Sequence, residues 1–219
     1  MVRVLPVAET FESLCLAGAV FYLRKERGTF WPGFIPFLAV TLAVELIGKY
    51  IGGFLHRPNT GLYNIYLIGD IGFVSWVLYR CYPGRRRWRP WFIGGFAGMA
   101  GIYFLELFLS HGKTYNSSTD SLSSFVFVFA CGIYYFLLLR QDRYDDLLKM
   151  PAFWIITGLF LFNFGTMVID LFPDELLGLY LTGTVSLRYA IVVFLMAILY
   201  GCWIYAFRCK YQETISSLA

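Results

Sequence analysis

Ionisable and polar side chains interrupt the apolar stretches of this chain at spacings that place them on common helix faces. Glu45 and Lys49 are four residues apart, so a carboxylate and an ammonium group can pair on one face of a helix. Two further stripes repeat at spacings of three and four: Tyr63, Tyr66 and Asp70, and Asn163, Thr166 and Asp170. The acids among these residues favour a cation or a polar, amine-bearing ligand. The spacing therefore indicates a candidate binding site.

Catalytic chemistry has less support in the sequence. Neither His56 nor His111 belongs to an H-E-x-x-H motif, and the chain has no G-x-S-x-G motif. We expect both histidines to be solvated near helix ends. Lys49 is the one lysine embedded in an apolar stretch, and a pair with Glu45 explains it better than a retinal Schiff base does. We predict no catalytic residue, no metal and no cofactor, and rank an intramembrane enzyme third among the functions.

Seven apolar stretches must position the polar side chains. They cover residues 4–23, 34–55, 62–77, 91–110, 121–139, 152–172 and 184–207. Each approaches the ~20 residues that a helix needs to cross ~30 Å of hydrocarbon. The chain is 58% hydrophobic and only 15% charged, whereas soluble domains carry roughly a quarter charged residues. We predict an all-α, polytopic membrane protein with seven transmembrane helices, and one domain over residues 1–219 because the connections are short.

The Lys and Arg residues between the stretches predict the orientation. One set of connections holds most of them: Arg24, Lys25, Arg27, Arg80, Arg85, Arg86, Arg87, Arg89, Arg140, Arg143, Lys149, Arg208 and Lys210. The opposite set holds only Arg3, Arg57 and Lys113. Because basic loops stay on the cytoplasmic side, we place the N-terminus outside and the C-terminus in the cytoplasm. The tail after Phe207 is too short for an output domain.

With this orientation, the embedded polar groups fall in the half of the membrane that faces away from the cytoplasm. Ionisable groups are expensive in hydrocarbon, so several at one level predict a functional cavity. The candidate ligand-binding residues are Glu12, Glu45, Lys49, Tyr66, Asp70, Glu106, Asn163, Asp170 and Arg188. Acids outnumber bases on this side, which favours a small polar or cationic ligand. The alternative is that Glu45–Lys49 and Asp70–Arg188 are ion pairs that only fasten helices.

Three other segments have simpler interpretations. The basic segment 80–90 is a topology signal beside anionic lipid, with Pro90 at the start of a helix. Gly94, Gly98 and Gly101 favour close helix packing within the chain, with a dimer interface as the alternative. The triplet beginning at Asn116 matches the glycosylation sequon, which matters only in a eukaryotic source.

Two segments of the sequence carry a resemblance. The first segment is VELIGKY at positions 44–50, followed by LYNIY at 62–66, and the second is MPAFWIITGL at 150–159. Both resemble segments of a large family of short bacterial inner-membrane proteins with seven helices and no characterised activity. Some of its members are thought to accompany sensor histidine kinases. Glu45, Asn64, Tyr66, Asp70 and Trp154 match the family pattern. The resemblance implies a multi-pass protein of the bacterial inner membrane and a part in signalling, and it supplies no catalytic residues.

The sequence thus favours a sensory or ligand-binding membrane protein that signals through a partner protein or a homodimer, with no nucleic-acid partner. A small transporter or ion pathway is the alternative. A transporter needs a polar route through the inner half of the membrane, where Thr157 is almost the only polar side chain of the spans.

Overall fold

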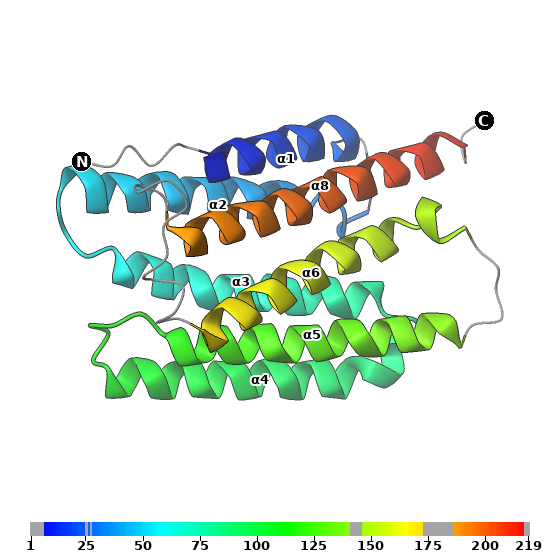
Figure 1. Ribbon diagram of the computed structural model, residues 1–219. Coiled ribbons are helices and arrows are strands. Elements are labelled where there is room, and N and C mark those ends of the chain that lie inside the picture. The colour runs from blue at the N-terminus through cyan, green and yellow to red at the C-terminus, as the bar shows by residue number, and fades with distance from the viewer. Residues whose placement is uncertain (1–6, 25, 27, 141–145, 173–185, 217–219) are drawn as a thin grey trace. The chain divides into compact units, whose positions relative to one another are not determined.

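The computed structural model describes residues 7–24, 26, 28–140, 146–172 and 186–216, which form helices and no β-strand. Six of these helices are long and apolar enough to cross a membrane, and a seventh precedes them in the chain. The all-α fold predicted from the sequence is therefore confirmed (Figure 1), and six helices have the length and hydropathy of membrane spans, whereas the seventh transmembrane span stays a prediction. The chain divides into two compact units, one made of residues 1–35 and 143–219 and the other of residues 36–142. The single domain and the orientation stay predictions.

The unit of residues 36–142 is built around three helices that contact one another: α3 (Thr60–Cys81), α4 (Arg85–Leu109) and α5 (Ser117–Leu139). They run side by side in Figure 1. Most of α2 (Phe34–Lys49) and the π-helical turn Tyr50–Phe54 precede them. The rings of Phe37 and Phe73 stack with their centroids 3.7 Å apart, and this contact joins α2 to α3.

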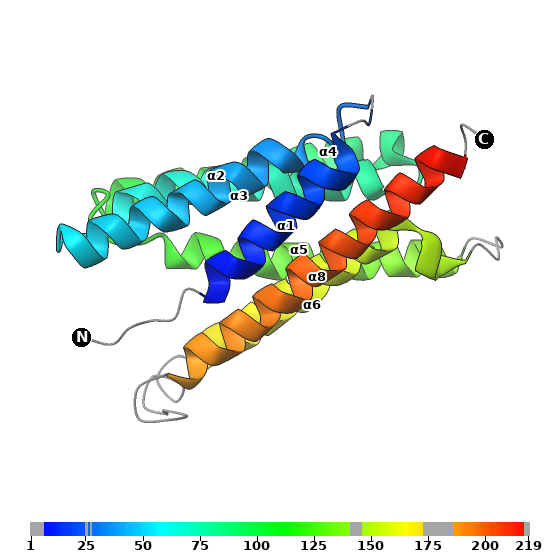
Figure 2. The same cartoon turned by 90° about the horizontal axis from the view of Figure 1, so that it is seen from above.

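The unit formed by the two ends of the chain holds α1 (Val7–Leu23), α6 (Pro151–Leu171) and α8 (Leu187–Ser216). Helix α8 contacts both α1 and α6, and Figure 2 shows α6 and α8 running together. Glycines permit this approach: a Cβ on Gly158 would lie 3.2 Å from the carbonyl oxygen of Leu199, and a Cβ on Gly165 would overlap Leu195. By contrast, a Cβ on Gly94, Gly98 or Gly101 would meet no atom within 4 Å. The glycines that pack helices are therefore not those of the predicted stripe.

Two helices differ clearly from the predicted spans. Helix α4 begins at Arg85, because Gly84 adopts a positive φ of 63° and turns the chain directly after α3. Pro90, expected at a helix start, consequently lies inside α4. Helix α8 continues to Ser216, so its 30 residues span ~45 Å and exceed the hydrocarbon thickness.

Some of the sequence-based assignments concern parts of the chain outside the described residues. These are the span starts at Val4 and Thr184 and the bases Arg3, Lys25, Arg27 and Arg143.

Candidate functional site

The nine candidate ligand-binding residues are divided between the two units. Glu45, Lys49, Tyr66, Asp70 and Glu106 belong to the unit of residues 36–142; the other four, Glu12, Asn163, Asp170 and Arg188, belong to the unit formed by the chain ends. Each group is described within its own unit. That all nine line one cavity stays a prediction.

Four side chains join α2 to α3 through polar contacts, and we call Thr41, Glu45, Tyr63 and Tyr66 the α2–α3 cluster. The Tyr63 hydroxyl donates to Glu45 Oε2 at 3.3 Å, and the hydroxyls of Tyr66 and Thr41 lie 2.8 Å apart. Thr41 Oγ1 also donates to the carbonyl oxygen of Phe37 at 3.0 Å. Because a threonine hydroxyl has one proton, Tyr66 is the donor in the contact with Thr41.

Two further candidates lie one turn beyond the α2–α3 cluster in sequence. Lys49 follows Glu45 by one turn at the end of α2 and is exposed, whereas Asp70 follows Tyr66 by one turn on α3 and is half-buried. Next to Asp70, the stacked rings of Phe37 and Phe73 close this side of the helix pair with apolar surface. The sequence predicted Glu45 and the tyrosines but missed Thr41, whose spacing of four from Glu45 was the available signal.

Glu106 has contacts of a structural kind. Its carboxylate accepts hydrogen bonds from Ser118 N at 3.1 Å, from Thr119 N at 2.9 Å and from the Thr119 hydroxyl at 2.7 Å. These groups lie in the first turn of α5, where backbone N–H groups lack helical partners and negative charge is favourable. Glu106 therefore fastens the end of α4 to the start of α5.

A buried hydrogen-bond network lies beside this contact. Asn116 donates its backbone N–H to Asn64 Oδ1 at 3.0 Å and its side-chain amide to the carbonyl oxygen of Tyr103 at 3.2 Å. The side-chain amide of Asn64 donates to the carbonyl oxygen of Thr114 at 3.0 Å. The Tyr103 hydroxyl donates to the backbone carbonyl oxygen of Asn64, also at 3.0 Å. Asn116 is 0% exposed. The predicted sequon is thus inaccessible in the folded chain, because its amide is buried and engaged.

In the unit formed by the chain ends, Asp170 and Arg188 contact each other, whereas the hydrogen bonds of Glu12 and Asn163 are made with other residues. Glu12 is 1% exposed, and the Tyr200 hydroxyl lies 3.5 Å from its Oε1. Asn163 donates to the carbonyl oxygen of Leu159 within its own helix at 2.8 Å. Asp170 Oδ1 lies 3.5 Å from the guanidinium of Arg188. The structure thus pairs Arg188 with Asp170, and the pair of Arg188 with Asp70, a residue of the other unit, stays a prediction.

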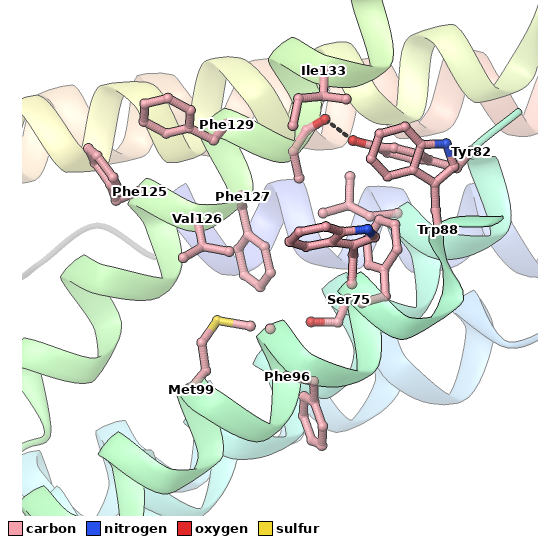
Figure 3. A pocket seen from close by; sticks show the side chains of 15 residues that line it. Ser75, Tyr82, Trp88, Phe96, Met99, Phe125, Val126, Phe127, Phe129 and Ile133 are labelled. Carbon is pink, nitrogen blue, oxygen red and sulfur yellow. Dashed lines mark hydrogen bonds between the residues drawn. The ribbon is translucent and has the colours of Figure 1, made fainter. Parts of the chain in front are cut away.

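The structure also contains an apolar pocket that the sequence did not predict. It has a volume of about 350 Å³ and lies between α3, α4 and α5, with Ser75, Trp88, Trp91, Phe96, Met99 and Phe127 among its lining residues (Figure 3). The Tyr82 hydroxyl donates to the carbonyl oxygen of Ala130 and ties the end of α3 to α5 at one end of this pocket. Aromatic residues are common on lipid-facing helices, so their sequence pattern alone gave no signal.

Within the described parts of the chain, no three His, Cys, Asp or Glu side chains are grouped closely enough to hold a metal ion. All five cysteines are free thiols. The described residues thus form polar contacts between α2 and α3 and an apolar pocket between α3, α4 and α5.

The fold and these surfaces define an all-helical membrane protein. The chain matches no family model, no curated protein and no solved structure. Its resemblance to seven-helix bacterial inner-membrane proteins stays a prediction.

Proposed function

We propose that this protein is a multi-pass receptor of the bacterial inner membrane that binds a small polar or cationic ligand and passes its state to a partner protein. The observation that carries the proposal is the α2–α3 cluster, in which Tyr63 bonds to Glu45 and Tyr66 bonds to Thr41 across the two helices. A carboxylate next to phenol rings suits an ammonium group, which the carboxylate neutralises while the aromatic faces attract the cation.

The energetics favour a binding role for Glu45 over simple fastening. An acidic side chain near the centre of a membrane helix costs roughly 2.5–3.5 kcal/mol on insertion scales. Hydrogen bonds between membrane helices return about 0.6 kcal/mol on average. Apolar packing joins helices without the insertion cost, so the presence of Glu45, Lys49 and Asp70 on the same two helices supports a polar binding site.

Signalling requires that the ligand distinguish two packings of the helices. A ligand shifts an equilibrium only by the difference in its affinity for the two states. The α2–α3 cluster is suited to this, because its contacts at 2.8 Å and 3.3 Å cross from one helix to the other. A ligand that competes for the Glu45 carboxylate would change how Tyr63 holds α3 against α2.

The test is thermal unfolding of the full chain in detergent, with a panel of primary and quaternary amines and with matched neutral polyols. We expect one class of amine to raise the melting temperature of the native protein. At a hundredfold excess over the dissociation constant, the stabilisation is about 2.7 kcal/mol. Glu45→Gln and Tyr66→Phe should abolish the shift.

Glu213→Gln is the matched control, because it removes one negative charge from an exposed site whose ion pair is with Lys210, one turn away on the same helix. It should respond to the amine as the native protein does. If no amine stabilises the native protein while Glu45→Gln lowers its melting temperature, Glu45 is a fastening residue and the proposal fails. Uptake of the stabilising amine into proteoliposomes would instead favour the transporter.

A further inference from the structure

Most of the basic segment 80–90 belongs to helix α4, so its positive charges lie at the N-terminus of a helix. Four arginines lie in the first turns of α4: Arg85, Arg86, Arg87 and Arg89. All four are exposed, and none forms an ion pair with any residue that the structure describes. Cations at a helix N-terminus oppose the helix dipole, whereas anions are stabilised there. A bound anion would therefore offset the unfavourable interaction between these positive charges and the helix dipole.

One of these arginines, Arg89, lies directly beside apolar space. Arg89 lines a second pocket of about 260 Å³ between α3 and α4, which shares Ser75, Phe92 and Phe96 with the pocket of about 350 Å³. The larger pocket extends along α4 from Trp88 to Met99. This distance is ~16 Å at 1.5 Å per residue, close to the ~15 Å of hydrocarbon in one leaflet.

Ser75 provides an independent indication of a ligand. Its side chain is 8% exposed, and its Oγ has no hydrogen-bond partner among the described residues. Figure 3 shows the hydroxyl directed into the larger pocket, and Ser75 also lines the smaller one. A buried hydroxyl without a partner is destabilising unless something occupies the adjacent space and accepts its proton. An ester carbonyl has the required chemistry.

We propose that the groove formed by these two pockets binds one anionic phospholipid, with its phosphate at Arg86 and Arg89, an ester carbonyl near Ser75 and an acyl chain along Phe96 and Met99. The lipid belongs to the leaflet predicted to be cytoplasmic, where anionic headgroups and basic residues attract one another. Apolar cavities of ~150 Å³ already bind hydrocarbons in preference to water, so the larger pocket has ample volume for part of an acyl chain.

The first test uses the tryptophans of the groove as reporters. Trp88 and Trp91 line the larger pocket and Trp76 the smaller one. Phosphatidylglycerol with brominated acyl chains, added to the full chain in detergent, should quench tryptophan fluorescence at a lower mole fraction than brominated phosphatidylcholine does. Equal quenching by the two lipids would overturn the proposal. Displacement of the lipid by inorganic phosphate alone would also overturn it, because the site would then recognise only the anion.

Charge variants test the headgroup contacts. Arg86→Gln with Arg89→Gln is expected to weaken phosphatidylglycerol binding about thirtyfold, which corresponds to ~1 kcal/mol for each base near an anionic surface. The matched control removes two bases on the same predicted side, Arg24→Gln with Arg208→Gln, both at exposed positions. The control should bind within about twofold of the native protein. Equal losses in the two double variants would show that only bulk charge matters.

A substitution that fills the groove tests the acyl-chain contacts. Gly95 lines the larger pocket, and a Cβ there would meet no atom within 4 Å, so Gly95→Leu enters free space. It also replaces a helix-interior glycine, which favours folding. Gly98→Leu is the control, since Gly98 has equal free space but does not line either pocket. We expect Gly95→Leu to lose the excess quenching and Gly98→Leu to keep it. The same quenching in both variants would refute acyl-chain binding in this groove.

Discussion

Glu106 offers the sharpest test of the structure, because we first expected it to bind a ligand and its contacts give it a structural function. The change is Glu106→Gln, which keeps the size of the side chain and removes its charge. The native carboxylate accepts three hydrogen bonds, at 3.1, 2.9 and 2.7 Å, from Ser118 and Thr119. Glutamine has one acceptor oxygen, so its amide group must face one of these donors.

The magnitude follows from the contacts. A hydrogen bond to a charged group contributes ~1.5–3 kcal/mol, and a negative charge at a helix N-terminus contributes ~0.3–1 kcal/mol. Loss of one such bond and of the charge predicts a destabilisation of about 2–4 kcal/mol. For a chain of this length, 1 kcal/mol corresponds to roughly 2–4 °C. Glu106→Gln should therefore lower the melting temperature in detergent by roughly 4–16 °C.

A double-mutant cycle with Thr119→Ala separates the energy of the Glu106–Thr119 contact from the other effects of each substitution on stability. Thr119 is 1% exposed and donates two of the three hydrogen bonds. We expect a coupling energy above ~0.5 kcal/mol between the two changes. Glu213→Gln, on an exposed turn, should stay within about 0.5 kcal/mol of the native protein. If Glu106→Gln melts like that control and shows no coupling, Glu106 does not fasten α5.

Three further outcomes are expected in the same unfolding assay. Asn64→Leu should destabilise the protein by about 2 kcal/mol or more, because it leaves the buried backbone N–H of Asn116 without an acceptor and removes the bond to the Thr114 carbonyl; a change under ~0.5 kcal/mol would contradict the network. Gly158→Leu should cost about 1–3 kcal/mol through overpacking against α8, whereas Gly98→Leu should be neutral or stabilising, and equal effects would refute the packing. A cycle of Asp170→Asn and Arg188→Gln should give a coupling under ~1 kcal/mol, because the pair is 29% and 44% exposed; a larger coupling would show a buried pair.

The helices were predictable where composition alone decides the structure. Apolar stretches of about 20 residues predicted the six long helices, but not that α4 starts among four arginines. That start depends on Gly84, whose positive φ is a property of the turn and not of hydropathy. The extension of α8 to Ser216 was missed for a related reason, since polar residues outside the membrane can continue a helix.

The candidate site was predictable only in part, because side-chain spacing does not name partners on other helices. Glu45, Tyr63 and Tyr66 were found through their stripes, and the structure brings them together with Thr41. The contacts of Glu106 were not predictable, because its partners are mainly backbone N–H groups of a neighbouring helix. Asn116 looked like a surface sequon because a short motif carries no information about burial. The apolar pocket arises from the packing of three helices and has no signature in any one of them.

The assembly of one unit from the two ends of the chain has a consequence for biosynthesis. The contact between Glu12 and Tyr200 joins residues 188 positions apart. At a synthesis rate of ~5–20 residues per second, roughly 10–40 s pass between the translation of these two residues. The unit of residues 36–142 is continuous in sequence and can assemble during this interval. Helix α1 must wait in the nascent chain for α8, so a chain truncated before α8 would leave two acidic side chains, Glu9 and Glu12, for the quality-control machinery of the cell to detect.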